Sequence, residues 1–254
     1  GGDLAGIRSR LAYIADLGVG GIYLNPILWS DSNHRYDTID YHSVEPDIGT
    51  EEELKTLIAE AHALGLRVMI DAVFNHCGAK CALWQDVLEK GPQSDYYHWF
   101  CVNRWPIDAQ THATKRGDYF SFAFVDNMPK FDTSEPDVME YLTGIAKHWV
   151  CEWKVDGIRF DVGNEISHAF LKHLRLELKK CNPKLFLLGE IWHDAFPWLL
   201  GDEYDSTMNY PFLACVNNFW ADKTQSGTDF MHGINQCYSC LLYTSPSPRD
   251  GLLS

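Results

Sequence analysis

Two short apolar segments of this chain each end on a carboxylate. Gly157–Phe160 leads into Asp161, with Arg159 two residues before it, and Leu187–Gly189 leads into Glu190. In a parallel α/β barrel the carboxyl-terminal ends of the strands meet in one mouth, so neighbouring strands would bring these groups together. Two such carboxyl groups suit hydrolysis of a glycosidic bond, one as nucleophile and one as acid/base, at a separation of about 5–5.5 Å for a retaining enzyme.

The segments that must position these residues alternate between helical and strand-like patterns. Apolar residues over 4–14 recur at helical spacing, which predicts one helix. Thr50 and Glu53 have the spacing of a capping box that opens a second helix. The strand predicted over 66–70 follows that helix and closes on Asp71. Strand, helix and strand at this spacing are typical of a parallel sheet.

The same alternation returns in the second half of the chain. Strands are predicted over 155–160 and 185–189, with a helix over 166–179 between them. In the first half, 33–49 is predicted to be a polar loop. Residues 77–130 are aromatic-rich and irregular, and they are too many for an ordinary barrel loop.

Composition narrows the class of protein. The 254 residues suffice for one barrel or two ordinary domains, and 46% hydrophobic with 22% charged residues is typical of a globular protein. A net charge of −14 argues against a nucleic-acid partner. No apolar run is long enough to cross a membrane and no signal peptide is recognisable, so we expect a cytoplasmic protein with no membrane partner.

The eight cysteines are scattered along the chain, as expected for free thiols in a reducing compartment. Cys77 and Cys81 lie near His76, a combination that can indicate zinc. This combination alone is too weak a signal, and no metal site is predicted.

Four motifs together resemble one family. Asp71–His76 (Asp-Ala-Val-Phe-Asn-His), Gly157–Glu165 (Gly-Ile-Arg-Phe-Asp-Val-Gly-Asn-Glu) and Gly189–Trp192 (Gly-Glu-Ile-Trp) are similar to the first three sequence motifs of the α-amylase superfamily, glycoside hydrolase family 13. Met128–Asp132 resembles the Met-Pro-Lys-Leu-Asn signature of its neopullulanase, cyclomaltodextrinase and maltogenic amylase group. The opening of the chain resembles the first barrel helix, and the resemblance extends to about residue 236.

The resemblance implies that Asp161 is the nucleophile that forms a glycosyl–enzyme intermediate and that Glu190 is the general acid/base. Arg159 would lie on the same face of the strand as Asp161 and would keep that carboxylate ionised by charge pairing. The alternative is a purely structural ion pair. Ile191 and Trp192 give Glu190 an apolar flank, which favours the protonated form that an acid needs.

The resemblance also implies residues that bind sugar. His76 would contact the sugar at the cleavage site, and Tyr36 would stack under its ring. Asn164 and Glu165 would line the acceptor side, where Trp192 would also stack. Core packing is the competing interpretation for Tyr36 and Trp192.

Asp71 and Asn75 would brace the site as structural support rather than act on the substrate. The resemblance implies no cofactor for these residues. The resemblance allows a structural calcium ion elsewhere in the full-length protein.

The chain departs from the family pattern in several places. A His-Asp motif with a third carboxylate should follow the seventh barrel strand, but here His193 and Asp194 come just after Glu190. Phe131 and Asp132 replace the Leu and Asn of the group signature. The first, seventh and eighth strands are not recognisable. We therefore expect a piece of a longer barrel that is inactive by itself.

The resulting fold prediction is α/β, an incomplete (β/α)8 TIM barrel with a small irregular domain inserted after the third barrel strand. Residues 1–76 would run from helix 1 to strand 3, and 77–130 would form the inserted domain B. Residues 131–236 would continue the barrel from helix 3 to about helix 6. The last segment, 237–254, contains Ser-Pro-Ser-Pro and is predicted to be a disordered tail outside the family pattern.

The functional expectation is a retaining glycoside hydrolase or transglycosylase that cleaves α-glucosidic linkages in maltodextrins, cyclodextrins or pullulan. Alternatives are an α-1,6-glucosidase, a branching or isomerising member of the superfamily, or a non-catalytic amylase-like accessory protein. The accessory proteins typically lose the catalytic carboxylates, whereas Asp161 and Glu190 are present here. The expected partner is an α-glucan oligosaccharide or cyclodextrin, and a homodimer is an option for the full-length protein.

Overall fold

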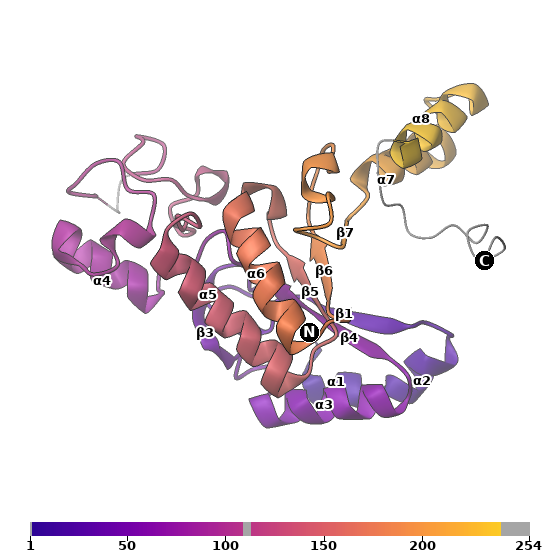
Figure 1. Cartoon of the computed structure of the whole chain (residues 1–254), viewed down its shortest axis with the longest axis horizontal. Coiled ribbons are helices and arrows are strands. Elements are labelled where there is room, and N and C mark those ends of the chain that lie inside the picture. The colour runs from indigo at the N-terminus through magenta and orange to yellow at the C-terminus, as the bar shows by residue number, and fades with distance from the viewer. Residues whose placement is uncertain (1, 109–112, 240–254) are drawn as a thin grey trace.

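A parallel sheet forms the centre of the computed structural model, which describes residues 2–108 and 113–239 (Figure 1). Five strands pair in the order β1-β4-β5-β6-β7, and every neighbouring pair is parallel. The sheet confirms the predicted α/β class and partial barrel. Its strands are β1 (Gly21–Leu24), β4 (Arg67–Ala72), β5 (Gly157–Phe160), β6 (Phe186–Gly189) and β7 (Ser206–Thr207).

Helices connect the strands and cover the outside of the sheet. In Figure 1, α3, α5 and α6 lie along the strands, whereas α7 and α8 extend away from them on the side opposite α4. The α-helices are α1 (Leu4–Arg8), α2 (Leu11–Asp16), α3 (Glu51–Ala63), α4 (Ala82–Lys90), α5 (Pro136–His148), α6 (His168–Cys181), α7 (Tyr210–Val216) and α8 (Gly227–Ser239).

The predicted first helix is two helices, with a break at Ser9 and Arg10. The Ser9 hydroxyl donates to the Gly6 carbonyl at 2.7 Å, and the Arg10 amide bonds the Ile7 carbonyl three residues back. Local side-chain bonds of this kind compete with the regular helical ladder. The capping box of α3 is confirmed, because the Thr50 hydroxyl accepts from the Glu53 amide while the Glu53 carboxylate accepts from the Thr50 amide.

Two other segments contain more regular structure than predicted. The segment expected to be a polar loop contains β3 (Thr38–Val44), which pairs antiparallel with β2 (Leu28–Ser30). The aromatic-rich segment after β4 contains α4 and short 3₁₀ turns at Gly91–Gln93, Tyr97–Trp99 and Phe122–Phe124. Its two ends meet in an antiparallel bridge between His76 and Lys130, so the segment leaves and rejoins the barrel at one point.

The end of the chain is described only in part. Helix α8 runs through Ser239, so the first residues of the predicted tail are helical. Residues 240–254 lie outside the described residues, and the prediction for them stays a prediction. Within the described ranges, no helix is both long enough and apolar enough to cross a membrane.

Tyr204 fixes the spacing between β5 and β6 at their carboxyl ends. Its side chain is buried, and its hydroxyl donates to the Gly163 carbonyl at 3.0 Å. A Cβ atom on Gly189 would lie 2.4 Å from the Tyr204 ring. Gly189 immediately precedes Glu190, so a glycine here lets the ring pack against the strand that delivers this carboxylate.

Gly189→Ala should therefore destabilise the protein. Overpacking of a buried site costs about 1–3 kcal/mol, which lowers Tm by roughly 2–10 °C for a chain of this size. Thermal unfolding followed by circular dichroism measures the change. Gly144→Ala is the matched control, because a Cβ there meets nothing within 4 Å inside α5, and alanine favours the helix. An equal Tm for Gly189→Ala and wild type would contradict the packing argument.

Candidate active site

The register of β4, β5 and β6 brings the predicted catalytic residues together. Phe160 pairs with Gly189 across β5 and β6, so Asp161 and Glu190 emerge side by side where these strands end. The Glu190 amide donates to the Phe160 carbonyl at 3.1 Å, which holds this register. Asp161 and Glu190 are each 7% exposed, at the floor of a cavity.

The Arg159 guanidinium joins three carboxylates. Its Nη1 donates to both oxygens of Asp71 at 3.0 Å and to Asp161 Oδ1 at 2.8 Å. Its Nη2 lies 2.8 Å from Glu190 Oε1. The predicted ion pair with Asp161 is confirmed, and the same arginine also binds the proposed acid/base. One positive charge thus faces three acidic groups that are all buried.

Asp71 lies deepest in this cluster and is held from several sides. It pairs across the strands with Arg159, and the hydroxyls of Tyr23 and Tyr36 both donate to its Oδ2. Burial raises the pKa of Asp71, although Arg159 and the two tyrosines act in the opposite direction. Burial and the Asp71 charge also raise the pKa of Tyr36 to about 12. These contacts fit the supporting role predicted for Asp71.

Opposing influences act on the ionisation of Asp161. Burial, followed by the neighbouring Asp71 charge, raises the pKa of Asp161 from 3.8 to about 7. Arg159 lowers it but does not outweigh these two causes. The predicted charge pairing is present, and burial and the Asp71 charge oppose its effect on the ionisation of Asp161.

Glu190 is oriented by backbone and side-chain donors. The Val162 amide donates to its Oε2 at 3.0 Å, and the Tyr210 hydroxyl donates to its Oε1 at 3.0 Å. Val162 has a φ of 48°, in the left-handed region that β-branched residues rarely adopt. Such strain persists only where the surroundings impose it and is concentrated at functional sites. Here it turns the chain immediately after Asp161.

A cavity of about 360 Å³ opens above the two carboxylates. Trp192, 63% exposed, stacks on Tyr210 with 4.2 Å between ring centroids and an interplanar angle of 10°. Core packing is therefore excluded for Trp192. The cavity is lined by His34, Tyr36, Phe122, Met128, Arg159, Asp161, Val162, Glu190 and Trp192.

His76 and Asn75 lie behind this cavity wall. The His76 side chain is fully buried, its Nε2 donates to the Tyr36 carbonyl at 2.9 Å, and its ring stacks on Phe122. Asn75 Nδ2 lies 3.2 Å from His76 Nδ1. Burial lowers the pKa of His76 to about 4, so the ring is neutral near pH 7. The bracing role of Asn75 fits these contacts, whereas a contact between His76 and a sugar stays a prediction.

The two predicted acceptor-side residues follow the strained turn. Asn164 and Glu165 belong to the 3₁₀ turn Gly163–Glu165. The Glu165 carboxylate is partly exposed and accepts from Lys130 Nζ at 2.6 Å, which links the inserted segment to the end of β5. Asn164 is half-buried, and its Oδ1 has no hydrogen-bond partner among the described residues. Their roles toward an acceptor stay predictions.

Sequence reasoning missed six residues of the site: Tyr23, His34, Phe122, Met128, Val162 and Tyr210. A tyrosine inside the apolar segment of β1 was a usable signal, because alternate residues of a barrel strand point inward. Phe122 lay in the segment predicted to be irregular. Tyr210 reaches Glu190 from the start of α7, and no pattern indicated how that helix would return to the site.

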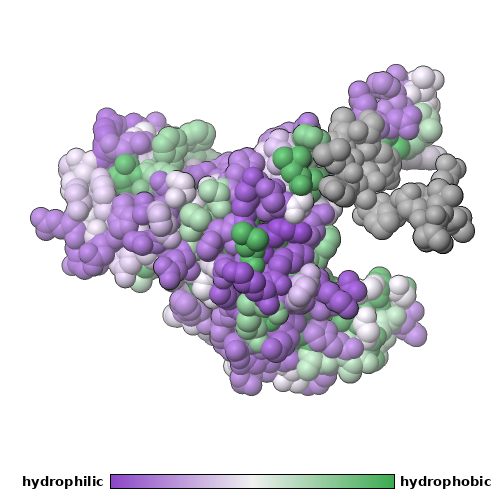
Figure 2. Space-filling model, viewed as in Figure 1, coloured by the Kyte–Doolittle hydropathy of each residue, from purple (hydrophilic) through white to green (hydrophobic). Residues whose placement is uncertain are grey.

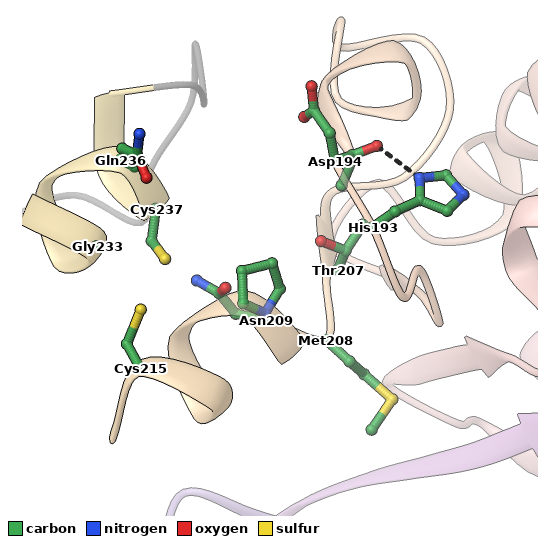
Figure 3. Close-up of a pocket in the computed structure, with 11 residues that line it drawn as sticks. His193, Asp194, Thr207, Met208, Asn209, Cys215, Gly233, Gln236 and Cys237 are labelled. Atoms are coloured by element: carbon green, nitrogen blue, oxygen red, sulfur yellow. Dashed lines mark hydrogen bonds between the residues drawn. The ribbon is translucent and has the colours of Figure 1, made fainter. Parts of the chain in front are cut away.

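A second cavity of about 310 Å³ lies between the loop after β6, the segment after β7 and α8 (Figure 3). His193 Nδ1 lies 3.0 Å from the backbone oxygen of Asp194. His193 and Asp194 line this second cavity and not the cavity above Asp161 and Glu190. Their position is consistent with the prediction that this dipeptide does not supply the third carboxylate.

Possible cation ligands within the described ranges are limited. His98, Glu135 and Asp137 have ligand atoms within 4.8 Å of one another, but the group is mostly exposed, which is common without an ion. The His76 imidazole bonds Tyr36 and Asn75, so it does not join Cys77 and Cys81 in a zinc-type cluster. The prediction of no metal site stays a prediction.

A partial parallel barrel with a carboxylate cluster at its strand ends defines the class of this protein, and residues 1–240 match the family of α-amylase catalytic domains. The chain belongs to that family. It is 47% identical to a cyclomaltodextrinase of Geobacillus thermopakistaniensis strain MAS1, over 98% of this chain and 44% of that protein. It is 46% identical to a maltogenic α-amylase of Bacillus acidopullulyticus, over 92% of this chain and 39% of that protein.

Two further matches agree with this group. Neopullulanase 2 of Thermoactinomyces vulgaris is 45% identical, over 87% of this chain and 37% of that protein. A solved structure of a cyclomaltodextrinase superposes with a TM-score of 0.90 at 38% identity, over 95% of this chain and 41% of that chain. The chain thus spans less than half the length of these relatives.

The raised pKa of Asp161 predicts a pH-dependent stability. Because its pKa in the folded state lies above 3.8, the folded state binds more protons than the unfolded state between about pH 4 and pH 7, and the free energy of unfolding falls as pH rises through this window. Asp161→Asn should flatten this fall and raise Tm near pH 7 more than near pH 4. Thermal unfolding across this pH range measures both changes.

Asp205→Asn is a control of opposite sign. Hydrogen bonds from Lys179, the Leu187 amide and Arg175 outweigh burial and lower the pKa of Asp205. Its stabilising contribution is present above the unfolded pKa and is lost as pH falls, so Asp205→Asn should lower Tm near pH 7. The electrostatic assignment is wrong if the two variants shift Tm in the same direction at that pH.

Proposed function

We propose that the protein containing this chain is a retaining glycoside hydrolase or transglycosylase of α-glucans. The observation that carries this proposal is the pair Asp161 and Glu190, placed at the ends of adjacent strands, joined by Arg159 and opening into a cavity with aromatic walls. Retaining glycosidases need two carboxyl groups close to one another on either side of the scissile bond.

Each carboxyl group has a defined part in the two steps. In the first step, ionised Asp161 attacks the anomeric carbon while the Glu190 carboxyl group protonates the departing oxygen. A covalent glycosyl ester on Asp161 results. In the second step, Glu190 takes a proton from water, or from a sugar hydroxyl in transfer, and that oxygen displaces Asp161. Arg159 stabilises the ionised nucleophile that the first step needs.

The aromatic walls of the cavity favour a substrate built of uncharged sugar rings. Tyr36, Phe122 and Trp192 present aromatic faces along the cavity, and such faces pack well on sugar rings. The relatives are named for cyclomaltodextrin, maltose and pullulan chemistry. We extend these names to the present protein as maltodextrins, cyclodextrins or pullulan.

Three other activities of the same family are alternatives to this proposed function. They are those of an α-1,6-glucosidase, a branching enzyme and an isomerising enzyme. A non-catalytic accessory role is less well supported, because both carboxylates and their arginine are in place. We also propose a cytoplasmic protein whose full-length form dimerises and needs no cofactor, with a structural calcium ion outside these residues left open.

Leaving-group chemistry separates the two catalytic roles. In the longest natural polypeptide that contains these residues, Glu190→Gln should lower kcat on maltodextrin by about 10²–10⁴-fold. The same variant should release the first equivalent of fluoride from maltosyl fluoride at nearly the wild-type rate, because fluoride leaves without a proton. Turnover should then slow, because the second step needs Glu190 as base. Asp161→Asn should be inactive on both substrates yet still bind maltodextrin, since binding and covalent catalysis depend on different contacts. Burst-phase and steady-state kinetics, together with calorimetric titration, supply these values.

Lys184→Gln is the control, because this exposed residue lies before β6 and outside the cavity. It should leave both rates unchanged. Equal rates of wild type and Asp161→Asn on maltosyl fluoride would refute the nucleophile assignment. A Glu190→Gln variant that hydrolyses maltodextrin at the wild-type rate would refute the acid/base assignment.

A further inference from the structure

The wall of the cavity above the two carboxylates continues onto a small antiparallel hairpin of the inserted segment. Ser121 pairs with Pro129 in this hairpin. The Phe122 amide donates to the Met128 carbonyl at 3.0 Å, so these two residues lie opposite one another, one step nearer the turn. Phe122 and Met128 both line the cavity, and their face of the hairpin therefore forms part of its wall.

The next cross-strand pair on the same face lies outside the cavity. The Lys130 amide donates to the Phe120 carbonyl at 3.0 Å, which places these two residues opposite one another on the far side of Ser121. Ser121 has extended backbone angles, φ −142° and ψ 161°. Side chains two residues apart in an extended strand point to the same face, about 7 Å from each other. Phe120 and Lys130 are absent from the cavity lining, so this pair extends the wall outward.

The exposure of alternate residues agrees with this arrangement. Tyr119 is 2% exposed and the Ser121 hydroxyl oxygen is buried, whereas Phe120 is 54% exposed. Figure 2 shows apolar residues at the surface of the inserted segment, at the upper left of the view. The Phe120 amide donates to the Cys101 carbonyl at 2.9 Å, and the Phe120 carbonyl accepts from Lys130. The backbone that carries this exposed ring is thus held from both sides.

An ion pair lies beside the Phe120 ring. Residues directly opposite in an antiparallel pair have Cβ atoms about 4.5–5.5 Å apart, so the Lys130 side chain starts next to the ring. Lys130 Nζ donates to the Glu165 carboxylate at 2.6 Å, and Glu165 belongs to the turn after β5. An aromatic face packs on the apolar face of a sugar ring, while charged groups bind its hydroxyls. The ring and the ion pair together suit an uncharged sugar.

We propose that Phe120 and the Lys130–Glu165 ion pair bind a glucose unit of the α-glucan that lies outside the cavity. This inference rests on the proposed function. The occupant is a further unit of the same glucan chain, because the surface is continuous with the cavity wall and begins about 7 Å from Phe122. The subsite therefore favours long α-glucans over short ones.

Kinetics with substrates of two lengths test the proposal. In the longest natural polypeptide that contains these residues, Phe120→Ser should raise KM for maltoheptaose about 3- to 10-fold, which is the loss of one aromatic contact. The kcat should not change, because this contact is made equally with substrate and transition state. The KM for 4-nitrophenyl maltoside should not change either, since that substrate is too short to reach residue 120. Phe120→Tyr keeps the aromatic face and should keep the wild-type KM for maltoheptaose.

Tyr13→Ser is the matched control, because this ring is 62% exposed on α2, which leads into the amino-terminal end of β1. It should leave both KM values unchanged. Equal KM values of wild type and Phe120→Ser for maltoheptaose, or an equal rise for both substrates, would overturn the inference. A changed oligomeric state of Phe120→Ser in analytical ultracentrifugation, with KM unchanged, would assign the ring to a protein contact instead. Wild type that cleaves neither substrate would refute the proposed function itself, and this inference with it.

Discussion

One guanidinium shared by three buried carboxylates is the constraint on which the site depends. Arg159 contacts Asp71, Asp161 and Glu190, and it is the positive group that keeps them in one place. Buried carboxylates are expensive unless they are paired and hydrogen-bonded. The pairing therefore demands that β4, β5 and β6 keep their register, because a slip of one residue would turn Arg159 away from its partners.

The remainder of the site supplies the hydrogen bonds that Arg159 cannot. Tyr23 and Tyr36 donate to Asp71, while the Val162 amide and Tyr210 donate to Glu190. These donors come from separate parts of the chain, including β1, the loop before β3, the turn after β5 and the start of α7. The site is thus satisfied only when the strands, the first long loop and α7 are all in place.

The sequence indicated the strands and their terminal residues well, because apolar runs and capping signals are local. Asp161, Glu190 and Arg159 were identified together, and the structure places them together. Long-range partners were harder to predict. Tyr210 contacts Glu190 because the chain returns to the site at the start of α7, and no local sequence pattern predicts that return. The ionisation of Asp161 depends on its distance from Asp71, which the sequence does not give.

The charge imbalance of the cluster links stability to the proposed catalysis. Burial, together with the excess of negative charge that three carboxylates leave against one guanidinium, raises the pKa of Asp161 and opposes folding near neutral pH. The transition state of glycoside hydrolysis resembles an oxocarbenium ion and carries positive charge. Fixed negative groups in a buried site stabilise such a charge without reorganisation during the reaction. In the proposed reaction, positive charge on the sugar would therefore relieve the repulsion that weakens the free protein, and the cluster would favour the transition state over the substrate.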